Sequence, residues 1–129
     1  METAQHILMN TEQKKALLLL KLVIFNYHGL DEVEKKILVD TATKLDALEE
    51  LKWAYSFSEI DNITSFERAR EFFKTTIASY EKDLKLDYIR LVWEDTNSKG
   101  YISEIEAMSM LKLAKDWGVQ KDLLALVRK

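Results

Sequence analysis

The sequence contains no proline and only three glycines, Gly29, Gly100 and Gly118. These are the two residue types that interrupt helices most strongly, so long helices can form wherever the apolar pattern supports them. We expect bends between helices at the three glycines. The 129 residues are enough to bury a hydrophobic core, and we expect a single helical domain over residues 1–129.

Cysteine is also absent, which excludes disulfides, thiolate catalysis and cysteine zinc sites. A chain without cysteine suits a reducing compartment, and we expect a cytoplasmic location. The net charge of −3 argues against a nucleic-acid-binding surface, because such surfaces are usually strongly basic. The longest apolar run, residues 16–25, is too short to cross a membrane and contains Lys21, so it predicts a buried helix and no transmembrane segment.

Apolar residues recur at spacings of three and four along most of the chain, which is typical of amphipathic helices. One such stripe is formed by Phe66, Ala69, Phe73, Ile77 and Tyr80. After Gly100, the pattern predicts an inward face containing Ile105, Met108, Leu111, Ala114 and Trp117. The sequence therefore predicts an all-α fold, a multihelical bundle around central buried helices.

Helix starts are indicated by capping residues, several of which are followed three residues later by Glu. A polar connection is expected at residues 56–65 and a break at residues 82–86. The expected starts are Asn10 or Thr11, Asp31 with Glu34, Asp46 with Glu49, Thr64 with Glu67, and Ser103 with Glu106.

The sequence also suggests an internal duplication. Aligning Glu34 with Glu106 places Leu38 on Met110, Val39 on Leu111, Ala42 on Ala114 and Leu45 on Trp117. The glycines then fall one place out of step, so the first bend is one residue shorter. We expect two similar helical halves, at about residues 1–58 and 59–129.

Residues 95–106 carry oxygen side chains at the spacing of a twelve-residue calcium loop. Position 5 of the loop is Lys99, which has donors and no acceptor, so we expect weak calcium binding of about 10⁻⁴–10⁻³ M at best. The predicted ligands are Asp95, Asn97, the backbone carbonyl of Tyr101, Ser103 and Glu106.

Helix-boundary chemistry explains most of the same residues without an ion. Ser103 is a good N-cap, and Glu106 three residues later completes a capping box. Gly100 suits a left-handed position between two helices. Both interpretations of the segment remain open from the sequence.

Two stretches resemble one protein family: the apolar helix ending at His28-Gly29 before Glu34, and Gly100-Tyr101-Ile102-Ser103 before Glu106. This pattern is similar to that of TerB-like, tellurite-resistance-type helical domains. The resemblance implies two similar halves around central helices, with acidic metal sites at the bends in some members. The family's acid before each glycine is replaced here by His28 and Lys99, and only Glu34 and Glu106 carry over. The segment 95–106 alone also resembles an EF-hand loop.

No nucleophile, nucleotide-binding or zinc motif is present, and the two histidines, His6 and His28, lie on different expected elements. We therefore expect a non-enzymatic binding or interaction module with a weak calcium site at residues 95–106. The alternatives are an ion-free protein–protein interaction domain and an enzyme with an unrecognised acidic site. The sequence does not identify a protein partner or an oligomeric state, and weakly bound calcium is the one cofactor expected.

Overall fold

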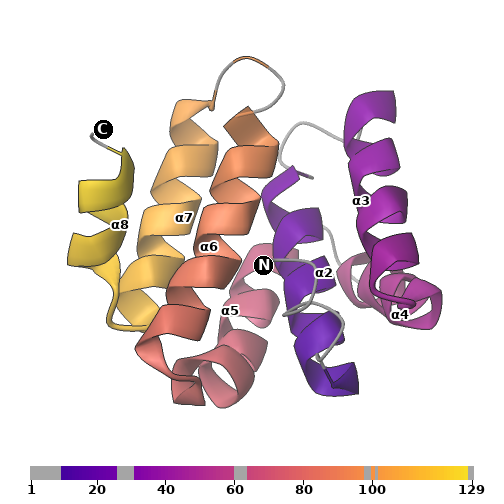
Figure 1. Cartoon of the computed structure of the whole chain (residues 1–129), viewed down its shortest axis with the longest axis horizontal. Helices are drawn as coiled ribbons and strands as arrows, with labels where there is room; N and C mark the ends of the chain where they lie inside the picture. Colours follow the sequence, from indigo (N-terminus) through magenta and orange to yellow (C-terminus); the bar gives the residue numbers. More distant parts are fainter. Residues whose placement is uncertain (1–9, 26–30, 60–63, 98–99, 101, 128–129) are drawn as a thin grey trace. The chain divides into compact units, whose positions relative to one another are not determined.

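The computed structural model describes residues 10–25, 31–59, 64–97, 100 and 102–127. These residues form α-helices and one 3₁₀ turn and contain no strand, which confirms the all-α prediction (Figure 1). The elements are α2 (Thr11–Phe25), α3 (Glu32–Lys44), α4 (Leu48–Glu59), α5 (Ser65–Thr76), η2 (Ile77–Ser79), α6 (Lys82–Asn97), α7 (Glu104–Asp116) and α8 (Gln120–Val127).

The chain divides into two compact units, Met1–Ala69 and Arg70–Lys129, so the division falls within α5. In the first unit, α2 packs against α3 and α4, which also contact each other. In the second unit, α6, α7 and α8 pack against one another and lie side by side (Figure 1). Each unit therefore has a three-helix core.

Helix α2 is buried on all sides, as its apolar run predicts. Every residue from Ala16 to Phe25 is buried, including Lys21. The Lys21 ammonium donates a hydrogen bond to the Thr41 hydroxyl of α3 at 3.2 Å. Among the described residues, none of the helices has both the length and the apolar character needed to cross a membrane.

The start of α2 is fixed by a reciprocal pair of hydrogen bonds. The Asn10 side chain accepts from the Gln13 amide at 2.8 Å, and the Gln13 side chain accepts from the Asn10 amide at 2.9 Å. This satisfies two of the backbone donors that a helix start leaves without partners. Asn10 is thus the cap that the sequence left undecided between Asn10 and Thr11.

Helices α3 and α7 end in the same way. The residue after each C-cap is left-handed, Asp46 with φ 53° and Gly118 with φ 76°. The next amide then bonds back to the helix, from Ala47 to the Ala42 carbonyl at 2.7 Å and from Val119 to the Ala114 carbonyl at 2.8 Å. This is a Schellman-type ending, which sends the chain sharply into the following helix.

The prediction that Asp46 caps the next helix is wrong. Asp46 occupies the left-handed position that ends α3, and α4 begins only at Leu48. Asp tolerates this conformation better than most residues, and the same preference makes it a common cap. Similarly, the break expected at residues 82–86 lies earlier, because α6 already begins at Lys82.

Burial follows the alignment of Glu34 with Glu106. Each buried residue on α3 and its bend has a buried counterpart on α7 and its bend. The pairs are Glu34 with Glu106, Leu38 with Met110, Ala42 with Ala114, Leu45 with Trp117, Ala47 with Val119, and Leu51 with Leu123. Helix bounds and end geometry thus recur along the chain at a constant offset.

Exchanging the two left-handed residues tests the bends. Asp46→Gly removes a Cβ from a positive-φ position and is expected to raise the free energy of unfolding by roughly 0.5 kcal/mol. Gly118→Asp is expected to lower it by a similar amount, although a Cβ there meets nothing within 4 Å. Urea unfolding of both variants measures the two changes, and an unchanged Gly118→Asp midpoint would contradict the backbone explanation.

Candidate functional site

The described members of the predicted cation site belong to the end of α6 and the start of α7. Asp95 and Asn97 belong to the last turn of α6, which continues to Asn97. Gly100 follows with φ 104°, and Tyr101 lies outside the described residues. Ser103 is the N-cap of α7, and Glu106 stands within its first turn.

The continuation of α6 separates the first two predicted ligands. Residues two apart on an α-helix do not face each other, so the side chains of Asp95 and Asn97 leave α6 on different sides. Between them, Thr96 is buried and its hydroxyl donates to the Val92 carbonyl at 2.8 Å. The sequence reading missed this because Asp, Thr and Asn are all common in loops.

Ser103 and Glu106 are brought together by a capping box. The Ser103 hydroxyl accepts from the Glu106 amide at 3.2 Å, and the Glu106 carboxylate accepts from the Ser103 amide at 2.9 Å. The Glu106 side chain is fully buried. The helix-boundary interpretation therefore accounts for the position of these two residues, and calcium binding stays a prediction.

A capping box also begins α3. The Asp31 side chain accepts from the Glu34 amide at 2.7 Å, and the Glu34 carboxylate accepts from the Asp31 amide at 3.3 Å. Glu34 is also buried. Both acids suggested by the family resemblance thus act as helix caps at the edge of a core.

The buried face of α7 differs from the one predicted. Ile105 and Met108 were expected to point inward, but they are 49% and 51% exposed. The buried stripe starts at the capping residue Glu106 and continues at helical spacing. Its members are Glu106, Ser109, Met110, Leu113, Ala114 and Trp117. Ala114 and Trp117 are buried as predicted, so the predicted face is wrong at Ile105 and Met108.

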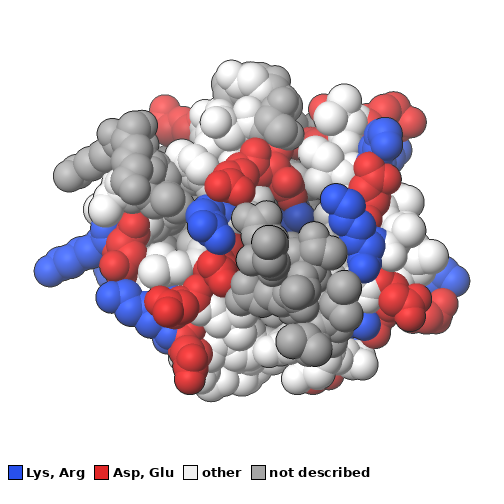
Figure 2. Space-filling model, in the orientation of Figure 1, with Lys and Arg blue, Asp and Glu red and all other residues white. Residues whose placement is uncertain are grey.

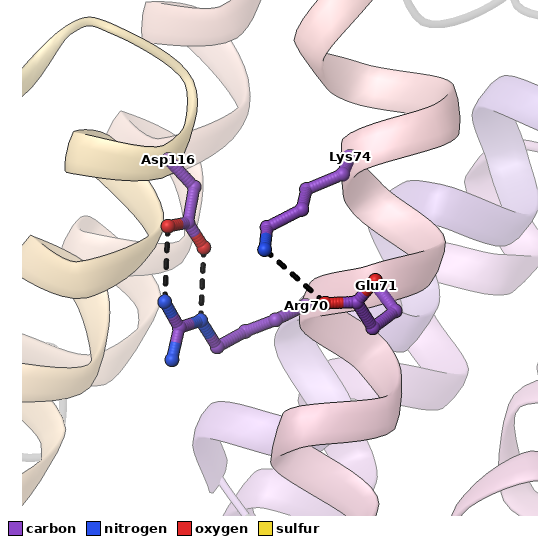
Figure 3. A network of polar contacts seen from close by, with 4 residues as sticks. All are labelled: Arg70, Glu71, Lys74 and Asp116. Atoms are coloured by element: carbon purple, nitrogen blue, oxygen red, sulfur yellow. Dashed lines mark hydrogen bonds and ion pairs between the residues drawn. The ribbon is translucent and has the colours of Figure 1, made fainter.

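Sequence reasoning also missed an ion pair between α5 and α7. Arg70 donates to Asp116 from Nε at 2.9 Å and from Nη2 at 3.0 Å (Figure 3). Both side chains are largely buried, and Glu71 pairs with Lys74 beside them at 3.1 Å. Nearby, Phe73 packs edge-on against Trp117 with ring centroids 5.9 Å apart. These contacts hold the C-terminal part of α5 against the end of α7.

Tyr88 is the most strongly perturbed titratable group in the described part of the chain. Burial, and to a lesser degree the neighbouring Tyr80, raises the pKa of its hydroxyl well above the ordinary value. The two rings meet edge to face at 5.6 Å. A phenol kept neutral in this way is a core residue and offers no base at neutral pH.

In the part of the chain that the structure describes, acidic side chains do not cluster in a way that suits a metal. Within the described ranges, no three of them gather closely enough to hold an ion. His6 and His28 lie outside those ranges. The carboxylates instead serve as caps, as at Glu106, or form ion pairs, as at Asp116.

Comparison with protein-family models, with curated proteins and with solved structures finds no match for this chain. The resemblances to TerB-like domains and to an EF-hand loop accordingly stay predictions.

Removing either cap oxygen tests how far the two boxes are equivalent. Ser103→Ala and Asp31→Ala each remove the acceptor for an amide in the first helical turn. We expect each to lower the free energy of unfolding by about 0.5–2 kcal/mol. Thermal and urea unfolding measure the loss, with Lys44→Ala on the exposed end of α3 as the control. A loss no larger than that of the control would contradict a structural role for the box.

Proposed function

We propose that this chain is a non-enzymatic helical interaction module that uses the outer face of α7. The main support is that Ile105 and Met108, one turn apart, are both about half exposed on a helix whose opposite face is buried. Exposed apolar side chains that lie together on one face favour a contact surface over an ordinary solvated helix.

The charges beside these two residues indicate the partner. Glu104 lies one residue before Ile105, and Lys112 lies one turn after Met108; both are exposed. In an antiparallel pairing of two α7 helices around Met108, each Glu104 stands opposite the Lys112 of the other copy. The face is therefore complementary to itself, and we commit to a second copy of this chain as the partner. One helix face is a small contact, so the association is expected to be weak.

Charge reversal tests this self-association. Sedimentation velocity over a concentration series is expected to show a monomer–dimer equilibrium in the unaltered chain. Met108→Glu places two like charges at the centre of the contact and is expected to weaken association on the order of tenfold or more. Lys112→Glu is expected to weaken it as well, and adding Glu104→Lys is expected to restore it.

Val39→Glu is the matched control, because Val39 is similarly exposed (47%) but lies on α3. A chain that stays monomeric at every concentration contradicts the homotypic contact. Equal losses for Met108→Glu and Val39→Glu contradict the choice of α7.

The two units are proposed to be copies of one three-helix plan, as the duplication hypothesis predicts. Matching bounds support this, because α3 and α7 have 13 residues each and each ends one residue before a buried C-cap, Leu45 or Trp117. Both are followed by a left-handed residue and then by a further helix. Such a plan agrees with the proposed TerB-like kinship.

A weak calcium site at residues 95–106 is the second candidate. The observation in its favour is that Ser103 and Glu106 already lie within hydrogen-bond distance at the end of the segment. A bound ion would have to compete with the capping bond for the Glu106 carboxylate, which agrees with the weak affinity expected from Lys99. The enzymatic alternative requires carboxylates that converge with His28, which lies outside the described residues.

Calcium titration tests the second candidate. Millimolar calcium is expected to raise the melting temperature of the unaltered chain, and magnesium is expected to do so less. Asp95→Ala combined with Glu106→Ala should abolish the response. Asp31→Ala with Glu34→Ala is the matched control, because it removes the equivalent cap without touching residues 95–106. A response that survives the first double variant would contradict the proposed ligands.

A further inference from the structure

An open cavity of about 430 Å³ lies at the bend between α7 and α8. It is formed where Gly118 turns the chain sharply, with the start of α6 on its other side. The residues that line it are Lys82, Lys115, Gly118, Gln120, Lys121 and Asp122. None of these residues is among Glu104, Ile105, Met108 and Lys112 or among the proposed calcium ligands, although Lys115 lies one turn beyond Lys112 on α7.

The lining is cationic although the whole chain has a net charge of −3. It holds three lysines and one acid, and Lys82 pairs with that acid, Asp122, at 3.4 Å. The side chains of Lys115 and Lys121 have no hydrogen bond or ion pair with any part of the chain that the structure describes. Two ammonium groups therefore face this cavity without a neutralising carboxylate.

Several lysines on the described helices are instead paired with an acid. Lys35, Lys52 and Lys74 each pair with an acid three residues earlier, at 3.1–3.4 Å. Such pairs leave little net charge on the helix surface. In Figure 2, Lys and Arg side chains lie near the left edge of the view, where Figure 1 places α8 and the bend before it, with Asp and Glu side chains beside them.

The backbone of the bend adds to the positive potential. Val119 precedes α8 and has no side-chain oxygen, so it cannot cap the amides of the first turn. Its own amide is used by the Ala114 carbonyl. The positive end of the α8 dipole lies beside the lysines, where an anion would be stabilised by both.

The equivalent bend in the first unit provides an internal comparison. The same offset that aligns Glu34 with Glu106 places Thr43 on Lys115, Glu49 on Lys121 and Glu50 on Asp122. There, two acids occupy the first turn of α4, as a helix start favours. In α8, Lys121 stands at the position of Glu49. A lysine there is unfavourable for the helix alone and becomes favourable when an anion is bound.

We propose that this cavity binds a small anion bearing phosphate groups, with Lys82, Lys115 and Lys121 as its charged contacts. The lysine ammonium is a compact point charge that binds phosphate oxygens well. The cavity is open to solvent and has room for a ligand larger than a single phosphate. The ligand class is therefore a diphosphate or an organic phosphate, free in solution or carried on a lipid headgroup.

Inorganic pyrophosphate is the probe for the binding experiment. The full chain, labelled with ¹⁵N, is titrated at low ionic strength while backbone amide resonances are followed by NMR. Saturable shifts are expected at Gly118 and at residues 120–122, and they should weaken as salt is added.

Two variants, Lys115→Thr and Lys121→Glu, introduce at the cavity the residues found at the aligned positions of the first unit. Each is expected to weaken binding on the order of fivefold to tenfold, because each removes a cation close to the ligand. Lys44→Glu is the control for net charge, since Lys44 is exposed and far along the sequence from the cavity. Circular dichroism of each variant checks that the helices are retained.

Three outcomes overturn the proposal: no saturable shift at millimolar pyrophosphate, shifts confined to residues away from the bend, or an equal loss in Lys44→Glu. A second arm identifies the source of the ligand. In one outcome the chain co-sediments with phosphoinositide vesicles, not with phosphatidylcholine vesicles, and is released by pyrophosphate. That result supports the proposed site and identifies a lipid headgroup as the source of its ligand. Pyrophosphate binding without co-sedimentation supports it with a free phosphate as ligand.

Discussion

The structure depends on how helices α3 and α7, one in each unit, are held at both ends. A buried carboxylate caps its start, at Glu34 or Glu106, and a left-handed residue turns its end, at Asp46 or Gly118. A carboxylate can be buried here because a backbone amide donates to it. With both ends fixed, each helix has a single rotation about its axis that buries the apolar residues between those ends. The cores of the two units follow from this constraint.

Much of the fold could be predicted from the sequence, because the information is local. The lack of proline, the apolar periods and the caps at Asp31 and Ser103 indicated helices, and α3 and α7 begin directly after those caps. Asp46 was misread because one residue type suits both a helix start and a left-handed helix end. Choosing between them requires knowledge of the hydrogen bonds that close the preceding helix.

The candidate site was less predictable, because the same oxygens serve either a cap or an ion. The Ser103–Glu106 spacing fits both, whereas the continuation of α6 through Asn97 depends on the burial of Thr96, which no motif encodes. Ile105 and Met108 were placed inward because they are apolar, while the buried stripe actually starts from an acid. The pairing of Arg70 with Asp116, and the approach of Lys82 to the bend at Gly118, join residues that are distant in sequence, so only the folded chain brings them together.

Lys21 has a further consequence for the first unit. Helix α2 is apolar nearly all round, so its own pattern does not distinguish one rotation about its axis from another. Turning the helix, or sliding it by a residue, would carry the Lys21 ammonium away from the Thr41 hydroxyl and into hydrocarbon. The hydrogen bond of Lys21 thus favours a single register between α2 and α3. An apolar residue in its place would leave the helix equally buried but free to settle in several alignments.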